Sequence, residues 1–77
     1  MRYIDNTNQP YQATTRAELA EELYRTSWAK VYSLSAAEWY ANAANRIQEQ
    51  YGYDIDYSSP TVFIDELIKH NLMMEMQ

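Results

Sequence analysis

Apolar residues recur at helical spacing in the first third of the chain. Thr15 and Glu18 stand three positions apart at the start of this stretch, in the arrangement of a capping box, where each side chain accepts a hydrogen bond from the other residue's backbone N–H. The spacing predicts a helix over about residues 15–32. The apolar positions of this helix are Leu19, Ala20, Leu23, Tyr24 and Trp28.

A second helix is predicted over residues 36–51. Ser35 and Glu38 form another capping box, and Leu34 and Trp39 occupy the two positions of a hydrophobic staple. Gly52, the only glycine, follows the last apolar position and can adopt the left-handed conformation that ends a helix.

A third helix is predicted over residues 60–70. Ser59 is the expected N-cap, and Pro60 suits the first helical position because proline lacks a backbone N–H. Asn71 can end the helix in the left-handed conformation, which would bring Leu72 against Leu67 in a Schellman motif. The apolar face comprises Val62, Phe63, Ile64, Leu67 and Ile68.

The remaining segments predict extended chain. Residues 1–13 form an N-terminal arm without a helical period, and residues 71–77 form a tail. Residues 53–57 alternate aromatic or aliphatic side chains with aspartates, the pattern of a short strand or of an extended loop. We therefore expect one mainly α domain of three helices, in which residues 2–5, 53–57 or 72–76 can add a short two- or three-stranded element at one end. The expected core is Leu19, Leu23, Trp28, Trp39, Ile47, Phe63, Ile64 and Leu67.

Composition narrows the class of protein. A chain of 77 residues forms one small domain that buries only about 60% of its extended surface. It has no cysteine, which fits a reducing compartment. The N-terminus lacks the apolar run of a signal peptide, and no window is apolar enough to span a bilayer. We expect a soluble protein of a bacterial cytoplasm with no membrane partner.

Few residues are suited to catalysis. The chain has no cysteine, a single histidine, His70, and one glycine, so neither a nucleophile–histidine pair nor a glycine-rich phosphate loop is expected. Asp54 and Asp56 lack the further carboxylates and central glycine of a calcium loop. The basic residues are scattered, which argues against direct binding of nucleic acid. We expect no enzyme, no cofactor and no metal.

Charge and tyrosine content indicate binding instead. The net charge is −5, and residues 53–77 hold five of the carboxylates against one lysine. Such a negative end attracts basic surfaces, although acidic side chains also serve solubility. There are eight tyrosines, a residue enriched at protein interfaces. The predicted partner-binding residues are Tyr53, Asp54, Asp56, Tyr57, Asp65, Glu66 and Glu75.

Two resemblances bear on the function. The run from Ser59 to Val62, followed by Leu67–Ile68 and Leu72–Met73, resembles the second half of a winged helix-turn-helix, which implies a regulator or adaptor. Asp65 and Glu66 depart from that family because they stand where groups that contact DNA are usual. The short, acidic, cysteine-free chain as a whole resembles anti-CRISPR and anti-restriction proteins of phages and mobile elements. This likeness is one of style, and it implies an inhibitor that docks on a nucleic-acid-binding host complex.

These observations lead to one expectation and two alternatives. We expect a non-enzymatic inhibitor of the anti-CRISPR type that docks on a basic, nucleic-acid-binding protein. The first alternative is a degenerate winged-helix regulator or adaptor, which could be a homodimer through exposed tyrosine and methionine side chains. The second is a small structural or assembly subunit, such as a virion component.

Overall fold

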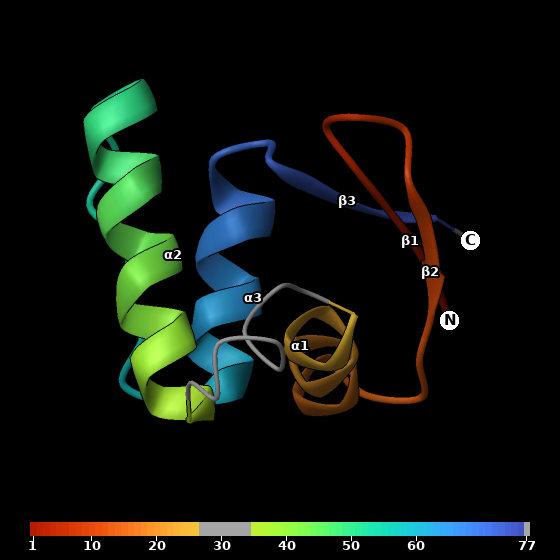
Figure 1. Cartoon of the computed structure of the whole chain (residues 1–77). Coiled ribbons are helices and arrows are strands. Elements are labelled where there is room, and N and C mark those ends of the chain that lie inside the picture. The colour runs from red at the N-terminus through yellow and green to blue at the C-terminus, as the bar shows by residue number, and fades with distance from the viewer. Residues whose placement is uncertain (27–34, 77) are drawn as a thin grey trace.

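The computed structural model describes residues 1–26 and 35–76. Within these residues, two strands come first, three helices follow, and a third strand comes last (Figure 1). The elements are β1 (Arg2–Asp5), β2 (Pro10–Gln12), α1 (Arg16–Arg25), α2 (Ala36–Tyr51), α3 (Pro60–Lys69) and β3 (Met73–Met76).

The expectation of a mainly α fold is wrong, because the strands form a sheet that is part of the core. The order is β2-β1-β3 and both pairings are antiparallel. On β1, Tyr3 lies opposite Tyr11 on one side and Glu75 on the other. The sheet joins the two ends of the chain and contains two of the expected segments, since β1 covers residues 2–5 and β3 lies within 72–76, whereas β2 was expected only as part of the N-terminal arm. The strands are three or four residues long, so their alternation does not show which segments pair.

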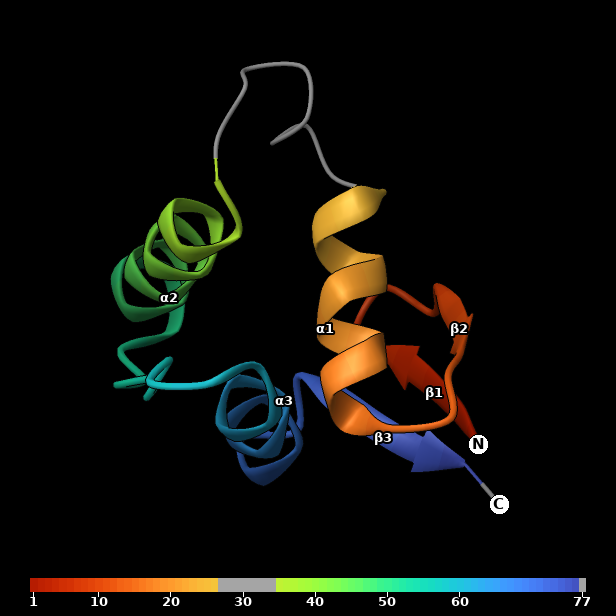
Figure 2. The same ribbon diagram turned by 90° about the horizontal axis from the view of Figure 1, so that it is seen from below.

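The helices lie on one side of this sheet, with α1 and α3 next to it and α2 beyond them (Figure 2). Tyr3 and Met73 point to that face and are buried, whereas Met74 and Met76 on the other face are 63% and 44% exposed. In Figure 1, α1 is seen end-on beside the sheet, and α2 and α3 run in the same direction. The architecture is therefore a small α+β fold with helices on one side of a three-stranded sheet.

α1 starts at the predicted N-cap and ends earlier, but the capping box is incomplete because the Glu18 carboxylate accepts from the Thr14 N–H at 3.2 Å and not from that of Thr15. The Thr15 side chain accepts a hydrogen bond from the Glu18 backbone N–H at 3.1 Å, which confirms the N-cap. The helix ends at Arg25, with Thr26 as its C-cap, so the expected helix over 15–32 is too long. The expected core residue Trp28 and the staple residue Leu34 lie outside the described residues.

The predicted limits of α2 and the predicted caps of α3 are confirmed. Ser35 and Glu38 form both hydrogen bonds of the capping box, and Gly52 ends α2 with a φ of 77°. Ser59 caps α3, which ends one residue before the predicted position. Beyond it, the Leu72 N–H donates to the Leu67 carbonyl at 2.8 Å, and Asn71 has a φ of 60°, as a Schellman motif requires.

Residues 53–57, which we expected as a short strand or an extended loop, join no sheet and form the loop. They belong to the connector, defined here as residues 52–59, which runs back behind α2 in the view of Figure 1 before α3 begins. Parallel consecutive helices need such a return segment, and an extended chain covers the distance in few residues. Ile55 faces the core and is 8% exposed, while Asp54 and Asp56 face solvent. The alternation was real, but it reflects a half-buried connection without strand pairing.

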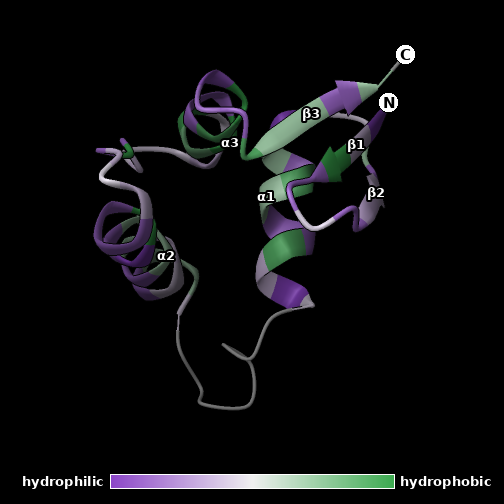
Figure 3. Ribbon diagram, turned by 90° about the horizontal axis from the view of Figure 1, so that it is seen from above, coloured by the Kyte–Doolittle hydropathy of each residue, from purple (hydrophilic) through white to green (hydrophobic). Residues whose placement is uncertain are grey.

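The core gathers where α1, α3 and β1 meet, and α2 is mostly hydrophilic (Figure 3). Four expected core residues are buried, namely Leu19, Phe63, Ile64 and Leu67, whereas Leu23, Trp39 and Ile47 are only partly buried. Residues that we did not expect complete the buried cluster: Tyr3, Ala13, Ala20, Tyr40, Ala44, Ile55 and Met73. None of the helices in the described part of the chain is long and apolar enough to span a membrane.

Candidate functional site

The connector presents exposed acidic side chains on an anchored backbone. Ile55 is buried beneath it, and the ring of Tyr53 stacks between Tyr51 at 5.9 Å and His70 at 4.4 Å. The Asp56 carboxylate accepts a hydrogen bond from the Ser58 backbone N–H at 2.9 Å. This bond lowers the pKa of Asp56, which keeps its charge over a wider pH range.

Three predicted binding residues project from this frame into solvent. Asp54 and Asp56 are both exposed, and Tyr57 is 46% exposed. Tyr53, the fourth predicted residue of the segment, is an anchor because its ring is stacked. The connector therefore offers two carboxylates and one aromatic ring to a partner.

Asp65 and Glu75, by contrast, are engaged within the chain. The Arg16 guanidinium forms ion pairs with the carboxylate of Asp65 and, at 3.2 Å, with that of Glu75. The hydrogen bond to Asp65 raises the pKa of Arg16, and the bond to Glu75 adds to this effect. This junction ties α1 to α3 and β3 and neutralises part of the charge that we assigned to partner binding.

Glu66 lies elsewhere on α3. Its carboxylate is 3.6 Å from Nε2 of His70, one turn further along the helix, an ion pair that exists only when the imidazole is protonated. His70 also stacks on Tyr53, so Glu66 belongs to the set of side chains that anchors the connector. The seven predicted residues thus have three settings, namely the connector, its anchor and the Arg16 junction.

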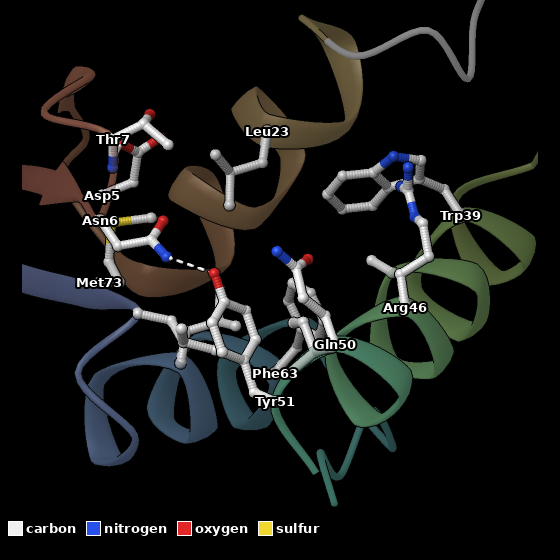
Figure 4. Close-up of a pocket in the computed structure, with 14 residues that line it drawn as sticks. Asp5, Asn6, Thr7, Leu23, Trp39, Arg46, Gln50, Tyr51, Phe63 and Met73 are labelled. Carbon is white, nitrogen blue, oxygen red and sulfur yellow. Dashed lines mark hydrogen bonds between the residues drawn. The ribbon is translucent and has the colours of Figure 1, made fainter. Parts of the chain in front are cut away.

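The structure also contains a cleft that we did not predict. It has a volume of about 410 Å³ and lies between α1, α2 and α3, with the β1–β2 turn at one end (Figure 4). Leu23 on α1 and Trp39 on α2 face each other across it, and Phe63 lies at its base. The apolar lining is completed by Ala43, Ile47, Leu67, Leu72 and Met73.

Polar groups from two elements also line this cleft. Arg46, Gln50 and Tyr51 come from α2, and residues 5–7 come from the β1–β2 turn. The Asn6 side-chain amide donates to the Tyr51 hydroxyl at 3.0 Å, which joins the turn to the end of α2. Asp5 is occupied in the turn itself, where one oxygen accepts from the Thr7 backbone, the Thr7 hydroxyl and the Gln9 backbone. Arg46 is exposed and forms no ion pair with any described residue.

A sequence signal for the cleft existed. Trp39, Ala43 and Ile47 recur every four residues on one stripe of α2, and Arg46 and Gln50 fall within the same stripe. Charged or amide side chains on a stripe that packs fully against a core would be costly to bury. Their presence there indicates a helix face that is partly open to solvent.

The described residues contain no cluster of three or more histidine, cysteine or acidic side chains suited to a metal ion. The arrangement is suited to binding by charge on the connector and by apolar contact in the cleft. No protein-family model, curated protein or solved structure gives a significant match to this chain.

Proposed function

We propose that the chain is a non-enzymatic binding protein whose connector docks on a basic surface of a nucleic-acid-binding protein. The observation that supports this proposal is that one short segment combines an anchored backbone with exposed side chains. Ile55 and Tyr53 hold the backbone in place, and Asp54, Asp56 and Tyr57 project from it. A partner therefore meets carboxylates whose backbone is already ordered, which reduces the entropy lost on binding.

The chemistry of the connector favours a basic partner. Asp54 and Asp56 are two residues apart in an extended segment, which places them on the same side of it. Arginine guanidinium groups that bind nucleic-acid phosphates also bind carboxylates with two parallel hydrogen bonds. An exposed tyrosine beside them can stack on such a guanidinium. Occupation of a phosphate-binding groove would make the chain a stoichiometric inhibitor, the role implied by its resemblance to anti-CRISPR proteins.

The experiment is a capture from nuclease-treated bacterial lysate with the tagged protein. We expect one basic, nucleic-acid-binding protein to be retained at low salt and released at high salt, because charge pairing at an exposed surface is screened by ions. Asp54→Lys should weaken its affinity by about tenfold or more, since an attraction becomes a repulsion.

The matched control is Glu21→Lys, which changes the net charge by the same amount on the exposed surface of α1. It should leave capture unchanged if the connector, and not overall charge, is responsible. If both variants lose capture of the partner equally, net charge and not the connector would account for binding. If the partner stays bound at high salt and also binds Asp54→Lys, docking by charge would be refuted.

A further inference from the structure

A second surface has a different chemistry from the connector. The cleft between α1 and α2 is lined mainly by apolar side chains, of which Leu23, Trp39 and Ile47 are half-buried, and no connector residue is among the described residues that line it. We propose that this cleft binds an amphipathic helix of a partner protein, with aliphatic side chains in the cleft and an acidic side chain paired with Arg46.

The walls of the cleft determine the shape of its occupant. Two of them are helices and its base is a third, and Leu23, Trp39 and Ile47 leave part of their surface uncovered there. Side chains on one helix form ridges that fit the grooves of another, so a fourth helix is the natural complement to such walls. Binding of an apolar helix face in a groove is a common mode of peptide recognition.

The volume sets the number of side chains that the cleft can take. A leucine side chain has four carbons, each of which occupies roughly the volume of one water molecule, about 30 Å³. The cleft of about 410 Å³ therefore has room for roughly three such side chains. Three aliphatic residues at positions i, i+3 or i+4, and i+7 make up the anchoring face of a helix two turns long.

Arg46 determines the charge of the occupant. Its guanidinium lies along the stripe of α2 that carries Trp39, and none of the described residues pairs with it (Figure 4). Asp5, the one carboxylate among the described residues that line the cleft, is already occupied by hydrogen bonds within the β1–β2 turn. An acidic residue on the incoming helix, at the edge of its apolar face, would give Arg46 a bidentate partner.

The probe is a display library of amphipathic helices of 16 residues, in which the apolar face and its flanks are randomised. Selection on the wild-type protein should enrich helices with three aliphatic residues on one face and an aspartate or glutamate beside them. Ala43→Trp, which fills the cleft, should abolish binding of the enriched helices. Ala37→Trp adds the same ring at an exposed position of α2 and should leave binding unchanged.

A charge swap tests the assignment to Arg46. Arg46→Glu should lower the affinity for an enriched helix by about tenfold. Replacement of the acidic residue of that helix by arginine should restore its affinity for Arg46→Glu. Asp54→Lys should have no effect, so failure of the connector proposal would leave this one standing. Failure to enrich any helix, or equal binding to Ala43→Trp, would overturn the proposal. Binding of dodecanoate in the cleft without enrichment of a helix would assign the site to a small anionic amphiphile instead.

Discussion

Replacement of Phe63 tests how α2 is joined to the rest of the molecule. Phe63 is 1% exposed, and its ring contacts two rings of α2, with centroid distances of 5.9 Å to Trp39 and 5.2 Å to Tyr40. Phe63→Ala removes both contacts and leaves a cavity at the base of the cleft. Phe63→Leu retains much of the volume and removes only the aromatic contacts.

The expected losses in unfolding free energy follow from these contacts. A buried phenylalanine replaced by alanine costs about 3–5 kcal/mol. Two ring contacts contribute about 0.5–1.5 kcal/mol each, so Phe63→Leu should cost about 1–3 kcal/mol. A chain of 77 residues has a total stability of about 4–12 kcal/mol, so the alanine variant should be close to unfolding and the leucine variant folded.

Urea unfolding followed by far-UV circular dichroism measures these losses. The midpoint of Phe63→Leu should fall while the slope of the free energy against urea stays constant. Tyr57→Leu is the matched control, because that ring is 46% exposed and its loss should change stability by about 0.5 kcal/mol or less. A loss of less than about 1 kcal/mol for Phe63→Ala would refute the conclusion that this residue joins α2 to the core.

Two further predictions concern turns. Partial burial acts to raise the pKa of Asp5, but hydrogen bonds from Thr7, Gln9 and Tyr11 outweigh it and lower that pKa below its ordinary value of 3.8. Asp5 therefore contributes to the free energy of unfolding above pH 3.8, and this contribution is lost as the pH falls through the pKa of Asp5 in the folded state. Urea titrations of wild type and Asp5→Asn should show a difference in stability at neutral pH that closes in acid. Gly52→Ala should lower the free energy of unfolding by about 1–2 kcal/mol in thermal unfolding, because φ at this position is 77°. Space for a methyl group is open, so the cost comes from the backbone conformation alone. Gly52→Asn should cost less, since asparagine adopts this conformation more readily.

The helix starts could be predicted because their signals are local. The capping residues Thr15, Ser35 and Ser59 each accept the expected hydrogen bond from a backbone N–H three residues ahead. Gly52 and Asn71 both adopt the left-handed conformation that their positions suggested. Such motifs depend on four to six consecutive residues, so a sequence contains all that is needed to recognise them.

The pairing of the strands, and the choice of which acidic side chains are paired within the chain, depend on contacts between residues that are far apart in sequence. Tyr3 pairs with Glu75, and Arg16 binds both Asp65 and Glu75, so the side chains involved lie 49 or more positions apart. No local pattern indicates which carboxylate a distant arginine will engage. The predicted acidic residues are therefore divided: Asp54 and Asp56 are exposed on the connector, whereas Asp65 and Glu75 are partly exposed and paired with Arg16.

The most direct test of the proposed function is competition for the captured partner. Fluorescently labelled nucleic acid bound to that partner should be displaced by the wild-type chain at a ratio near one to one, and Asp54→Lys should need about tenfold more protein. Glu21→Lys should displace as well as wild type. Simultaneous binding of the chain and the nucleic acid, with no displacement at saturation, would contradict the proposal that the connector occupies a phosphate-binding surface.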